Sequence, residues 1–268
     1  MPILSNSAWA RADRHAPATL AGGSARSNVA PMPADGELQP ASDAKRRAAL
    51  AALEYVRPNT VVGLGSGSTA ALFIAELGRR VKTGQIEGIE GVATSLPSEA
   101  LARQAGIPLV DPAQGVRCDV VVDGADEVAD NLDLVKGRGG ALVREKIVAQ
   151  ASDRRVIIVD EGKCVPRLGE KCPLPVEVLR WGHDWQADFL RGLGGDPVLR
   201  LARGDRPVVT DNGHYIYDVA FGPIADPAEL ERRLLDRGGV VQTGLFLGMA
   251  DVVLVAGADG TVTARERA

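Results

Sequence analysis

Short apolar runs alternate with longer amphipathic segments along the chain from about residue 43 to residue 172. Runs of four or five mostly apolar residues predict buried strands, and apolar positions spaced three or four apart predict helices. The predicted strands are residues 60–64, 91–95, 107–110, 119–123 and 156–159. The predicted helices are residues 44–55, 70–80, 98–105 and 140–151. This alternation predicts a parallel sheet whose strands are joined by crossover helices.

The pattern changes after about residue 173. Two alternating runs, 208–210 and 214–219, flank Asp211-Asn212-Gly213, and Asn-Gly between such runs predicts a hairpin. A helix is predicted at 227–235 and a strand at 240–246, while the apolar run 250–256 is predicted to return to the first sheet. The predicted fold class is α/β, a Rossmann-like parallel sheet flanked by helices, with an inserted smaller α+β domain. The predicted domains are 42–172 together with 248–268 for the α/β domain and 173–247 for the inserted domain.

Residues 1–41 differ from the rest of the chain because they are rich in Ala, Ser, Pro, Gly and Asn and show no sustained apolar period. This composition predicts a disordered N-terminal extension. A targeting peptide is the alternative, since Arg11, Arg14 and Arg26 outnumber nearby acids. The segment lacks the continuous apolar stretch of a secretion signal.

Composition and charge restrict the class of protein. The 268 residues are 45% hydrophobic but only 4% aromatic, which suits a core of Val, Leu, Ile and Ala in a covered sheet. A formal net charge of -4 with both signs interspersed argues against nucleic acid as a partner. No apolar run reaches the roughly 20 residues of a membrane helix, so no membrane association is expected. Three cysteines without a CxxC pair predict reduced thiols and a cytoplasmic location.

The segment Gly63-Leu64-Gly65-Ser66-Gly67-Ser68-Thr69 lies between a predicted strand and a predicted helix. Glycines let the backbone approach a ligand closely, and a helix N-terminus offers free N–H groups to an anion such as phosphate. The segment matches neither a P-loop, since no Lys follows the last Gly, nor the dinucleotide fingerprint. Simple helix capping by Ser68 or Thr69 is the alternative.

Acids follow another strand, in Asp123-Gly124-Ala125-Asp126-Glu127. Three acids at the carboxyl end of a strand are costly without a partner, so they indicate either a metal site or carboxylates that bind sugar hydroxyls and move protons. A solvated turn is the alternative, and it suits Glu127 better than the two aspartates.

Two further segments place cations at strand ends. Lys136-Gly137-Arg138-Gly139-Gly140 leads into a helix that carries Glu145, and Lys163 follows the strand 156–159. Taken alone, Glu145 is more often a surface acid paired with Arg144 or Lys146, and Lys163 a solvated lysine. However, four segments now bring functional groups to the same edge of one parallel sheet, which is where ligands bind in open α/β sheets.

The sequences GLGSGSTA, TSLPSEALARQAGIPL, DGADE, KGRGGALVREKIVA and GEKCPLPVEV together resemble the ribose-5-phosphate isomerase A family, from about residue 43 to the C-terminus. The resemblance implies an enzyme of the pentose phosphate pathway that interconverts D-ribose 5-phosphate and D-ribulose 5-phosphate through an enediol(ate). It also implies no cofactor, no metal and a sugar phosphate as the small-molecule partner. A homo-oligomer is expected, with a homodimer favoured.

The resemblance also implies roles for individual residues. Glu145 is expected to be the base on carbon, with Asp123, Asp126 and Lys136 as the other catalytic groups. The substrate-binding positions implied are Ser66, Gly67, Ser68, Thr69, Asp123, Gly124, Ala125, Asp126, Lys136, Gly137, Arg138, Gly139, Lys163 and, from the first helix, Lys45.

Some positions depart from the family pattern, and other functions stay open. Arg138 stands where the family usually has a glycine; it is strained if that position requires a positive φ. Otherwise its side chain reaches solvent or adds a cation to the site. Another sugar-phosphate isomerase, an activated-acid transferase and a catalytically silent sugar-phosphate sensor are the competing functions. A histidine-based isomerase is disfavoured because His15, His183 and His214 lie outside the four segments.

Overall fold

The computed structural model describes residues 40–202 and 204–267. The predicted N-terminal extension therefore lies outside the described residues, apart from positions 40 and 41, where the first helix begins. The α-helices are α1 (Pro40–Ala52), α2 (Ser68–Lys82), α3 (Leu96–Ala105), α4 (Leu142–Gln150), α5 (His183–Gly192) and α6 (Pro227–Leu235). Short 3₁₀ helices are η1 (Leu53–Tyr55), η2 (Pro112–Gln114) and η3 (Glu161–Lys163).

The strands form three sheets. The six-stranded sheet has the order β13-β12-β6-β3-β1-β2, the four-stranded sheet β10-β7-β9-β8, and the three-stranded sheet β11-β5-β4. Their bounds are β1 (Val61–Leu64), β2 (Glu90–Ala93), β3 (Cys118–Asp123), β4 (Glu127–Val128), β5 (Leu134–Val135), β6 (Ser152–Asp160), β7 (Leu174–Val178), β8 (Asp196–Leu199), β9 (Tyr215–Ala220), β10 (Val240–Thr243), β11 (Leu245–Phe246), β12 (Val252–Ala256) and β13 (Val262–Glu266).

The large sheet is parallel except at one edge. Strands β2, β1, β3, β6 and β12 run parallel to their neighbours, and β13 pairs antiparallel with β12. The carboxyl ends of β1, β3 and β6 therefore meet at one edge of the sheet. The predicted α/β fold with a helix-flanked parallel sheet is confirmed, and residues 252–256 return to this sheet as expected.

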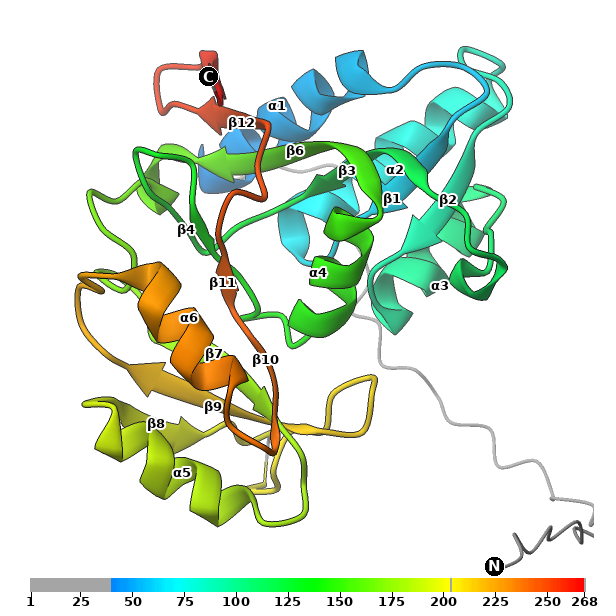
Figure 1. The fold of residues 1–268 in the computed structure, drawn as a ribbon. Helices are drawn as coiled ribbons and strands as arrows, with labels where there is room; N and C mark the ends of the chain where they lie inside the picture. The colour runs from blue at the N-terminus through cyan, green and yellow to red at the C-terminus, as the bar shows by residue number, and fades with distance from the viewer. Residues whose placement is uncertain (1–39, 203, 268) are drawn as a thin grey trace, which may run out of the picture. The chain divides into compact units, whose positions relative to one another are not determined.

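Alternating side chains give the large sheet two buried faces. Val62, Leu64, Val120 and Val122 belong to a core shared with α1, α2 and α3. The intervening Val121 packs with Val148 of α4 in a second cluster, and the strands of the three-stranded sheet cover the rest of this face (Figure 1). Burial on both faces explains why these strands read as continuous apolar runs.

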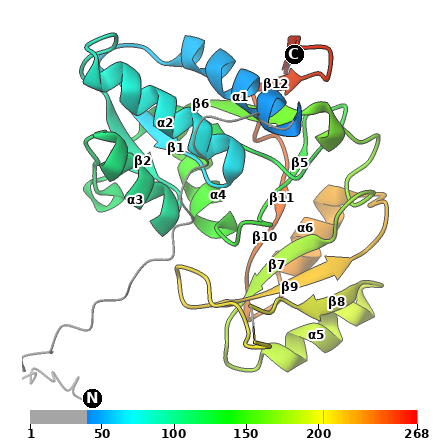
Figure 2. The ribbon, with the colours of Figure 1, turned by 180° about the vertical axis from the view of Figure 1, so that it is seen from behind.

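The four-stranded sheet packs with α5 and α6 around a core of its own (Figure 2). All four of its strands lie between residues 174 and 243, within the predicted inserted domain. Yet β11, from the end of that segment, pairs with β5 and so joins the three-stranded sheet. The proposed domain boundary near residue 247 is therefore crossed by backbone pairing.

Two of the predicted strands are not formed. Residues 107–110 form only an isolated bridge between Leu109 and Gly91. Residues 208–210 form no strand, although the predicted turn is present: Thr210 N–H donates to the His214 carbonyl, and Gly213 has a φ of +84°. Strand β9 pairs instead with β7 and β8, because its apolar residues join the core formed with α5 and α6.

The predicted strand at 240–246 is divided at Gly244 into β10 and β11, which belong to different sheets. Gly244 donates its N–H to the Pro175 carbonyl and accepts the Lys136 N–H on its own carbonyl. A Cβ at Gly244 would lie 2.3 Å from the Lys136 carbonyl oxygen. Only glycine permits this close approach of two backbones, so the division occurs at this residue.

Glu127 is not in a solvated turn, contrary to the preferred interpretation of the sequence. Its side chain is fully buried, and its carboxylate accepts the backbone N–H groups of Gly169, Lys171 and Cys172 at 2.5, 2.6 and 2.8 Å. These three N–H donors replace the water that a buried carboxylate loses. Glu127 thus holds the 169–172 loop in place.

Candidate active site

A pocket of about 120 Å³ lies at the carboxyl edge of the large parallel sheet. Every residue that lines it is a predicted site residue: Lys45, Ser66, Gly67, Ser68, Thr69, Gly124, Ala125, Asp126, Lys136, Gly137, Gly139, Glu145 and Lys163. Of the predicted site residues, Asp123 and Arg138 do not line it. The predicted convergence of the four segments is present, but only the segments after β1, β3 and β6 come from the parallel sheet. The Lys136 loop follows β5 of the antiparallel three-stranded sheet, so its placement at the edge of one parallel sheet is wrong.

The turn after β1 is shaped for an anion. Gly67 is the N-cap of α2, with a φ of +90°, and Ser68 and Thr69 begin the helix. The first N–H groups of a helix have no intrahelical partners and carry partial positive charge. Lys45 adds a cation beside them, because its Nζ donates to the Ser68 Oγ at 3.1 Å. Phosphate is the kind of group that such a turn binds.

Asp123 lies beneath this turn and fixes it. Its Oδ1 accepts the N–H groups of Ser66 and Gly124 at 2.9 and 2.8 Å. A Cβ at Gly65 would lie 2.3 Å from this same oxygen, so the close approach of turn and carboxylate requires glycine. The side chain of Asp123 is 4% exposed, and its Oδ2 lies 3.0 Å from Lys136 Nζ.

Lys136 is a buried cation among oxygens. Its Nζ donates to the Gly124 carbonyl at 2.6 Å and lies 3.0 Å from Asp123 Oδ2 and 3.3 Å from Glu145 Oε2. Burial alone lowers the pKa of this amine, but Asp123 and then Glu145 outweigh burial and hold the pKa well above its ordinary value. Lys136 therefore remains protonated at neutral pH and presents a fixed positive charge to the pocket.

Glu145 is buried in the first turns of α4, with 4% of its side chain exposed. The interpretation as a surface acid paired with Arg144 or Lys146 is wrong: Lys146 Nζ pairs with Glu231 at 2.9 Å, and Glu145 pairs with Lys136. Burial raises the pKa of Glu145 to about 7, since the lowering by Lys136 is smaller and Asp123 raises the pKa further. Among the described residues Glu145 Oε2 accepts no hydrogen bond of good geometry.

The Gly-rich loop adopts a conformation that accommodates Arg138. The left-handed residues of the loop are Gly137 and Gly140, with φ of +106° and +81°, whereas Arg138 is outside this region and is unstrained. Its N–H donates to Asp126 Oδ2 at 3.0 Å, and its side chain is exposed. The departure from the family's usual glycine therefore leaves the loop intact.

Sequence reasoning missed the hydroxyl cluster that supports Ser66. The Ser66 Oγ lies 2.8 Å from both Thr94 Oγ1 and Ser95 Oγ, and the Ser98 Oγ donates to the Gly65 carbonyl at 2.6 Å. Ser95 is also the N-cap of α3, where its side chain accepts the Ser98 N–H. A serine shortly before a helical proline is a capping signal, and this signal could have located the cluster.

The parallel sheet and its charged pocket define an α/β enzyme of a small anionic substrate. Residues 90–260 match the family model of ribose 5-phosphate isomerase A (phosphoriboisomerase A). The chain belongs to this family, and it is an isomerase of the pentose phosphate pathway that interconverts ribose 5-phosphate and ribulose 5-phosphate.

The similarity of this chain to individual members of the family extends over most of their length. The chain is 51% identical to ribose-5-phosphate isomerase A of Thermomicrobium roseum, over 81% of this chain and 91% of the relative. It is 50% identical to that of Deinococcus radiodurans, over 81% and 95%. A solved D-ribose-5-phosphate isomerase in complex with phospho-erythronic acid superimposes with a TM-score of 0.82 and 40% identity, over 85% of this chain and 99% of that chain. The enzyme of Methanocaldococcus jannaschii gives a TM-score of 0.79 at 42% identity, over 84% and 98%.

Proposed function

We propose that Glu145 is the base that moves the proton between C2 and C1 of the sugar phosphate. The observation that carries this proposal is the position of the Glu145 carboxylate, which is shielded from bulk solvent but lines the pocket. Its Oε2 lies 3.3 Å from Lys136 Nζ and accepts no hydrogen bond of good geometry from the described residues. A carboxylate whose pKa is near the working pH combines adequate basicity with a useful deprotonated fraction. The raised pKa of Glu145, about 7, supports this role.

The proposed reaction proceeds through an enediolate. Glu145 removes the proton from C2 of the open-chain aldose, and the electron pair of that C–H bond forms the C1–C2 double bond while O1 becomes negative. Lys136 stabilises this oxygen. The proton on O2 then moves to O1, assisted by Asp123, and Glu145 returns its proton to C1 to give the ketose. Asp126, which lines the pocket, orients the sugar hydroxyls.

The phosphate is proposed to bind at the turn Ser66 to Thr69. The helix N-terminus at Ser68 and the cations of Lys45 and Lys163 around the same pocket support this placement. Gly124, Ala125, Gly137 and Gly139 supply the rest of the lining. Phospho-erythronic acid, the ligand of the solved relative, combines a phosphate with a carboxylate and suits such a pocket. Asp123 does not line the pocket, so its proposed part in ring opening and in the transfer of the proton from O2 to O1 is exerted through Lys136, whose Nζ lies 3.0 Å from the Asp123 Oδ2.

No metal or other cofactor takes part in the proposed reaction, since Lys136 supplies the positive charge beside the developing oxyanion. Within residues 40–202 and 204–267, no group of three or more His, Cys, Asp and Glu side chains could hold a metal ion. Metal independence stays a prediction, and activity after dialysis against EDTA tests it.

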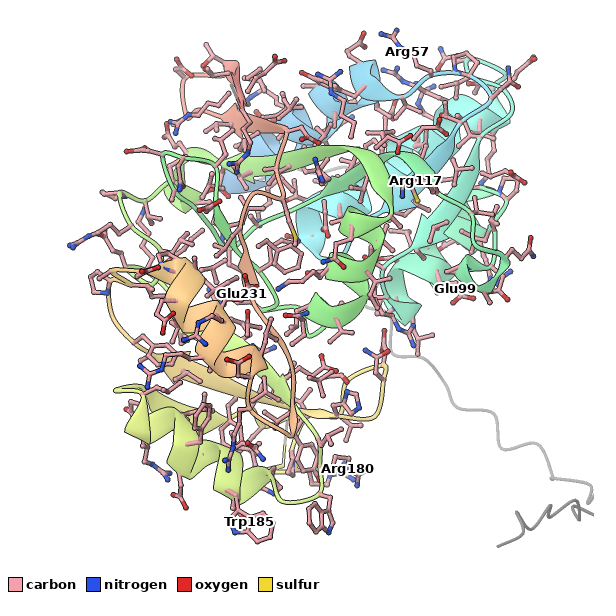
Figure 3. All side chains as sticks on the ribbon, viewed as in Figure 1. Arg57, Glu99, Arg117, Arg180, Trp185 and Glu231 are labelled. Carbon is pink, nitrogen blue, oxygen red and sulfur yellow. The ribbon has the colours of Figure 1, made fainter. Side chains whose placement is uncertain are left out.

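A homodimer in the cytoplasm is the proposed setting of the enzyme. Trp181 and Trp185 are 81% and 58% exposed, and their ring centroids lie 5.5 Å apart. This exposed aromatic pair, of which Figure 3 labels Trp185, supports an interface on the side of the smaller sheet. In the described part of the chain, no helix has the length and apolar character needed to cross a bilayer. Light scattering tests the dimer, and cell fractionation tests the location.

The pH dependence of kcat/KM is the direct test of the base. Glu145 acts only when deprotonated, and its pKa in the folded protein is raised to about 7. We expect kcat/KM to fall about tenfold per pH unit well below pH 7 and to level off above it. A coupled assay of ribulose 5-phosphate formation from about pH 5.5 to about pH 8.5 measures this profile. A profile that stays flat across that range contradicts the proposed base.

A further inference from the structure

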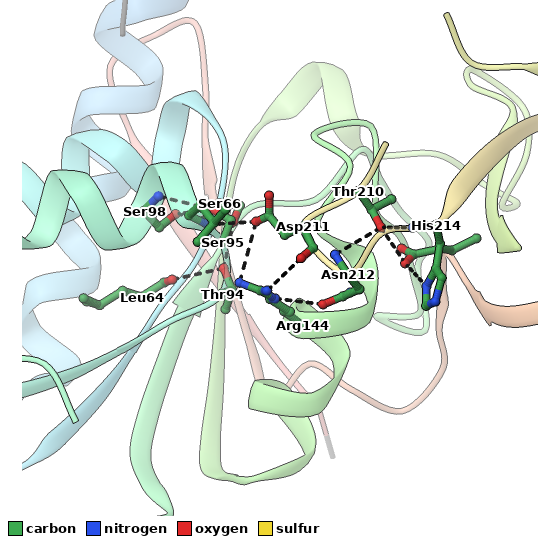
Figure 4. A network of polar contacts seen from close by, with 12 residues as sticks. Leu64, Ser66, Thr94, Ser95, Ser98, Arg144, Thr210, Asp211, Asn212 and His214 are labelled. Atoms are coloured by element: carbon green, nitrogen blue, oxygen red, sulfur yellow. Dashed lines mark hydrogen bonds and ion pairs between the residues drawn. The ribbon is translucent and has the colours of Figure 1, made fainter. Parts of the chain in front are cut away.

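The turn at residues 210–214, here called the crossing turn, bonds to two helices that border the active site (Figure 4). The Asp211 carboxylate accepts the Leu96 N–H at 2.8 Å. Arg144 donates to the Asp211 carbonyl at 3.0 Å and to the Asn212 Oδ1 at 2.9 Å. One short turn from the segment that carries the smaller sheet therefore joins α3 to α4.

On the α3 side, the crossing turn is connected to the turn from Ser66 to Thr69, which is proposed to bind the phosphate and is here called the phosphate turn. Leu96 is the first residue of α3, and its N-cap Ser95 lies 2.8 Å from the Ser66 Oγ. Ser98, in the same helical turn, donates to the Gly65 carbonyl. A displacement of the first turn of α3 would therefore move the backbone that holds the substrate's phosphate.

The α4 side leads to the proposed base. Arg144 immediately precedes Glu145 in the first turns of α4. Its guanidinium makes two hydrogen bonds to the crossing turn and lies 3.8 Å from the Asp211 carboxylate, with 33% of the Arg144 side chain exposed. These bonds fix the start of the helix that presents Glu145 to the pocket.

The crossing turn is itself held by a buried carboxylate. Glu177 of β7 is fully buried, and its Oε1 accepts the Thr210 Oγ1 hydroxyl at 2.9 Å and lies 2.9 Å from His214 Nδ1. The Thr210 Oγ1 in turn accepts the N–H groups of Asn212 and His214. The turn is thus a supported structure whose position is set by the smaller sheet.

We propose that the crossing turn positions both halves of the active site, with Asp211 acting on the phosphate turn through α3 and Arg144 acting on Glu145 through α4. The proposal rests on the proposed roles of Glu145 and of the Ser66 to Thr69 turn. Because the Asp211 carboxylate bonds to α3 while Arg144 bonds mainly to backbone and Asn212, the two connections can be broken separately.

The test compares Arg144→Met and Asp211→Ala with the control Asp188→Ala, whose carboxylate is 76% exposed in α5. We expect Arg144→Met to lower kcat about tenfold with KM within about twofold, because misplacing a catalytic group slows the chemical step. We expect Asp211→Ala to raise KM about fivefold with kcat within about twofold, the effect of losing one hydrogen bond that holds the phosphate turn. Asp188→Ala is expected to keep the kcat and KM of the unaltered enzyme.

Two further measurements separate positioning from general damage. Arg144→Lys keeps the positive charge but has one donor nitrogen in place of the two that Arg144 uses. It is expected to recover part of the kcat lost in Arg144→Met, with the melting temperature of the unaltered enzyme. The proposal is overturned if both variants match the control, or if each changes kcat and KM together in step with a lower melting temperature. Glu145→Gln is measured in the same assay: full turnover there removes the proposed base, whereas an inactive Glu145→Gln beside unaffected Arg144→Met and Asp211→Ala removes the crossing turn alone.

Discussion

Replacing Glu145 by glutamine is expected to lower kcat by about 10²–10⁴ while KM changes by no more than a few-fold. Glutamine keeps the size of the side chain but cannot accept a proton from carbon. The phosphate turn, Lys45 and Lys163 stay in place, so binding of the substrate persists. The coupled assay of ribulose 5-phosphate formation measures turnover, and titration calorimetry with ribose 5-phosphate measures binding.

The matched control for this variant is Glu99→Gln on α3, where the carboxylate is 39% exposed and pairs with Arg103. It makes the same chemical change away from the pocket and is expected to keep full activity. Turnover of Glu145→Gln at the level of this control would show that another group removes the proton.

Lys136→Met is expected to lower kcat by about 10²–10³, the usual cost of removing one group that stabilises a developing oxyanion. A second effect follows from the pair that Lys136 forms with Glu145. Lys136 lowers the pKa of Glu145, so its removal raises that pKa further above about 7. The acidic limb of the residual kcat/KM profile is therefore expected to shift to higher pH.

The control for Lys136→Met is Lys82→Met, whose exposed amine donates to the Gln104 carbonyl at the end of α3. Circular dichroism must show that Lys136→Met is folded, since a buried ion pair that loses one partner destabilises a protein. Lys136→Arg keeps the charge and serves if the methionine variant fails to fold. Variants of Lys136 that are folded and fully active would exclude it from the reaction.

The parallel sheet was predictable from sequence because its strands are buried on both faces and follow each other with helices between them. Helix α6 was predicted at its observed bounds, since Pro227 and the Asp226 cap mark its start. The strand pairing of the four-stranded sheet was not predictable, because it depends on contacts between segments that are distant in the sequence. Strand β8 and helix α5 were missed, and residues 208–210 were assigned to a partner that β9 does not use.

Much of the lining was predictable for a different reason: parallel topology brings the carboxyl ends of β1, β3 and β6 to the same edge, whereas the Lys136 loop after β5 and Lys45 of α1 were located through the family resemblance. The burial of Glu145 could not be derived from α4 alone, where an acid beside Arg144 and Lys146 suggests a surface ion pair. It depends on Lys136 from another loop and on Glu231 of α6, which takes Lys146. The crossing turn was recognisable as a turn, but its bonds to Leu96 and Arg144 were not.

The backbone bonds of Gly244 have a consequence for synthesis of the enzyme. Lys136 donates its N–H to the Gly244 carbonyl, and β6 pairs with β12, so the segments around the site are completed by residues 244–256, which are made about 100 residues after Glu145. The ribosome makes Ser66, Asp123 and Glu145 long before Gly244, and domains fold as their segments emerge. Fragments released before Gly244 therefore lack a partner for the Lys136 backbone, and catalytic capacity is expected only after Gly244 and β12 have been synthesised.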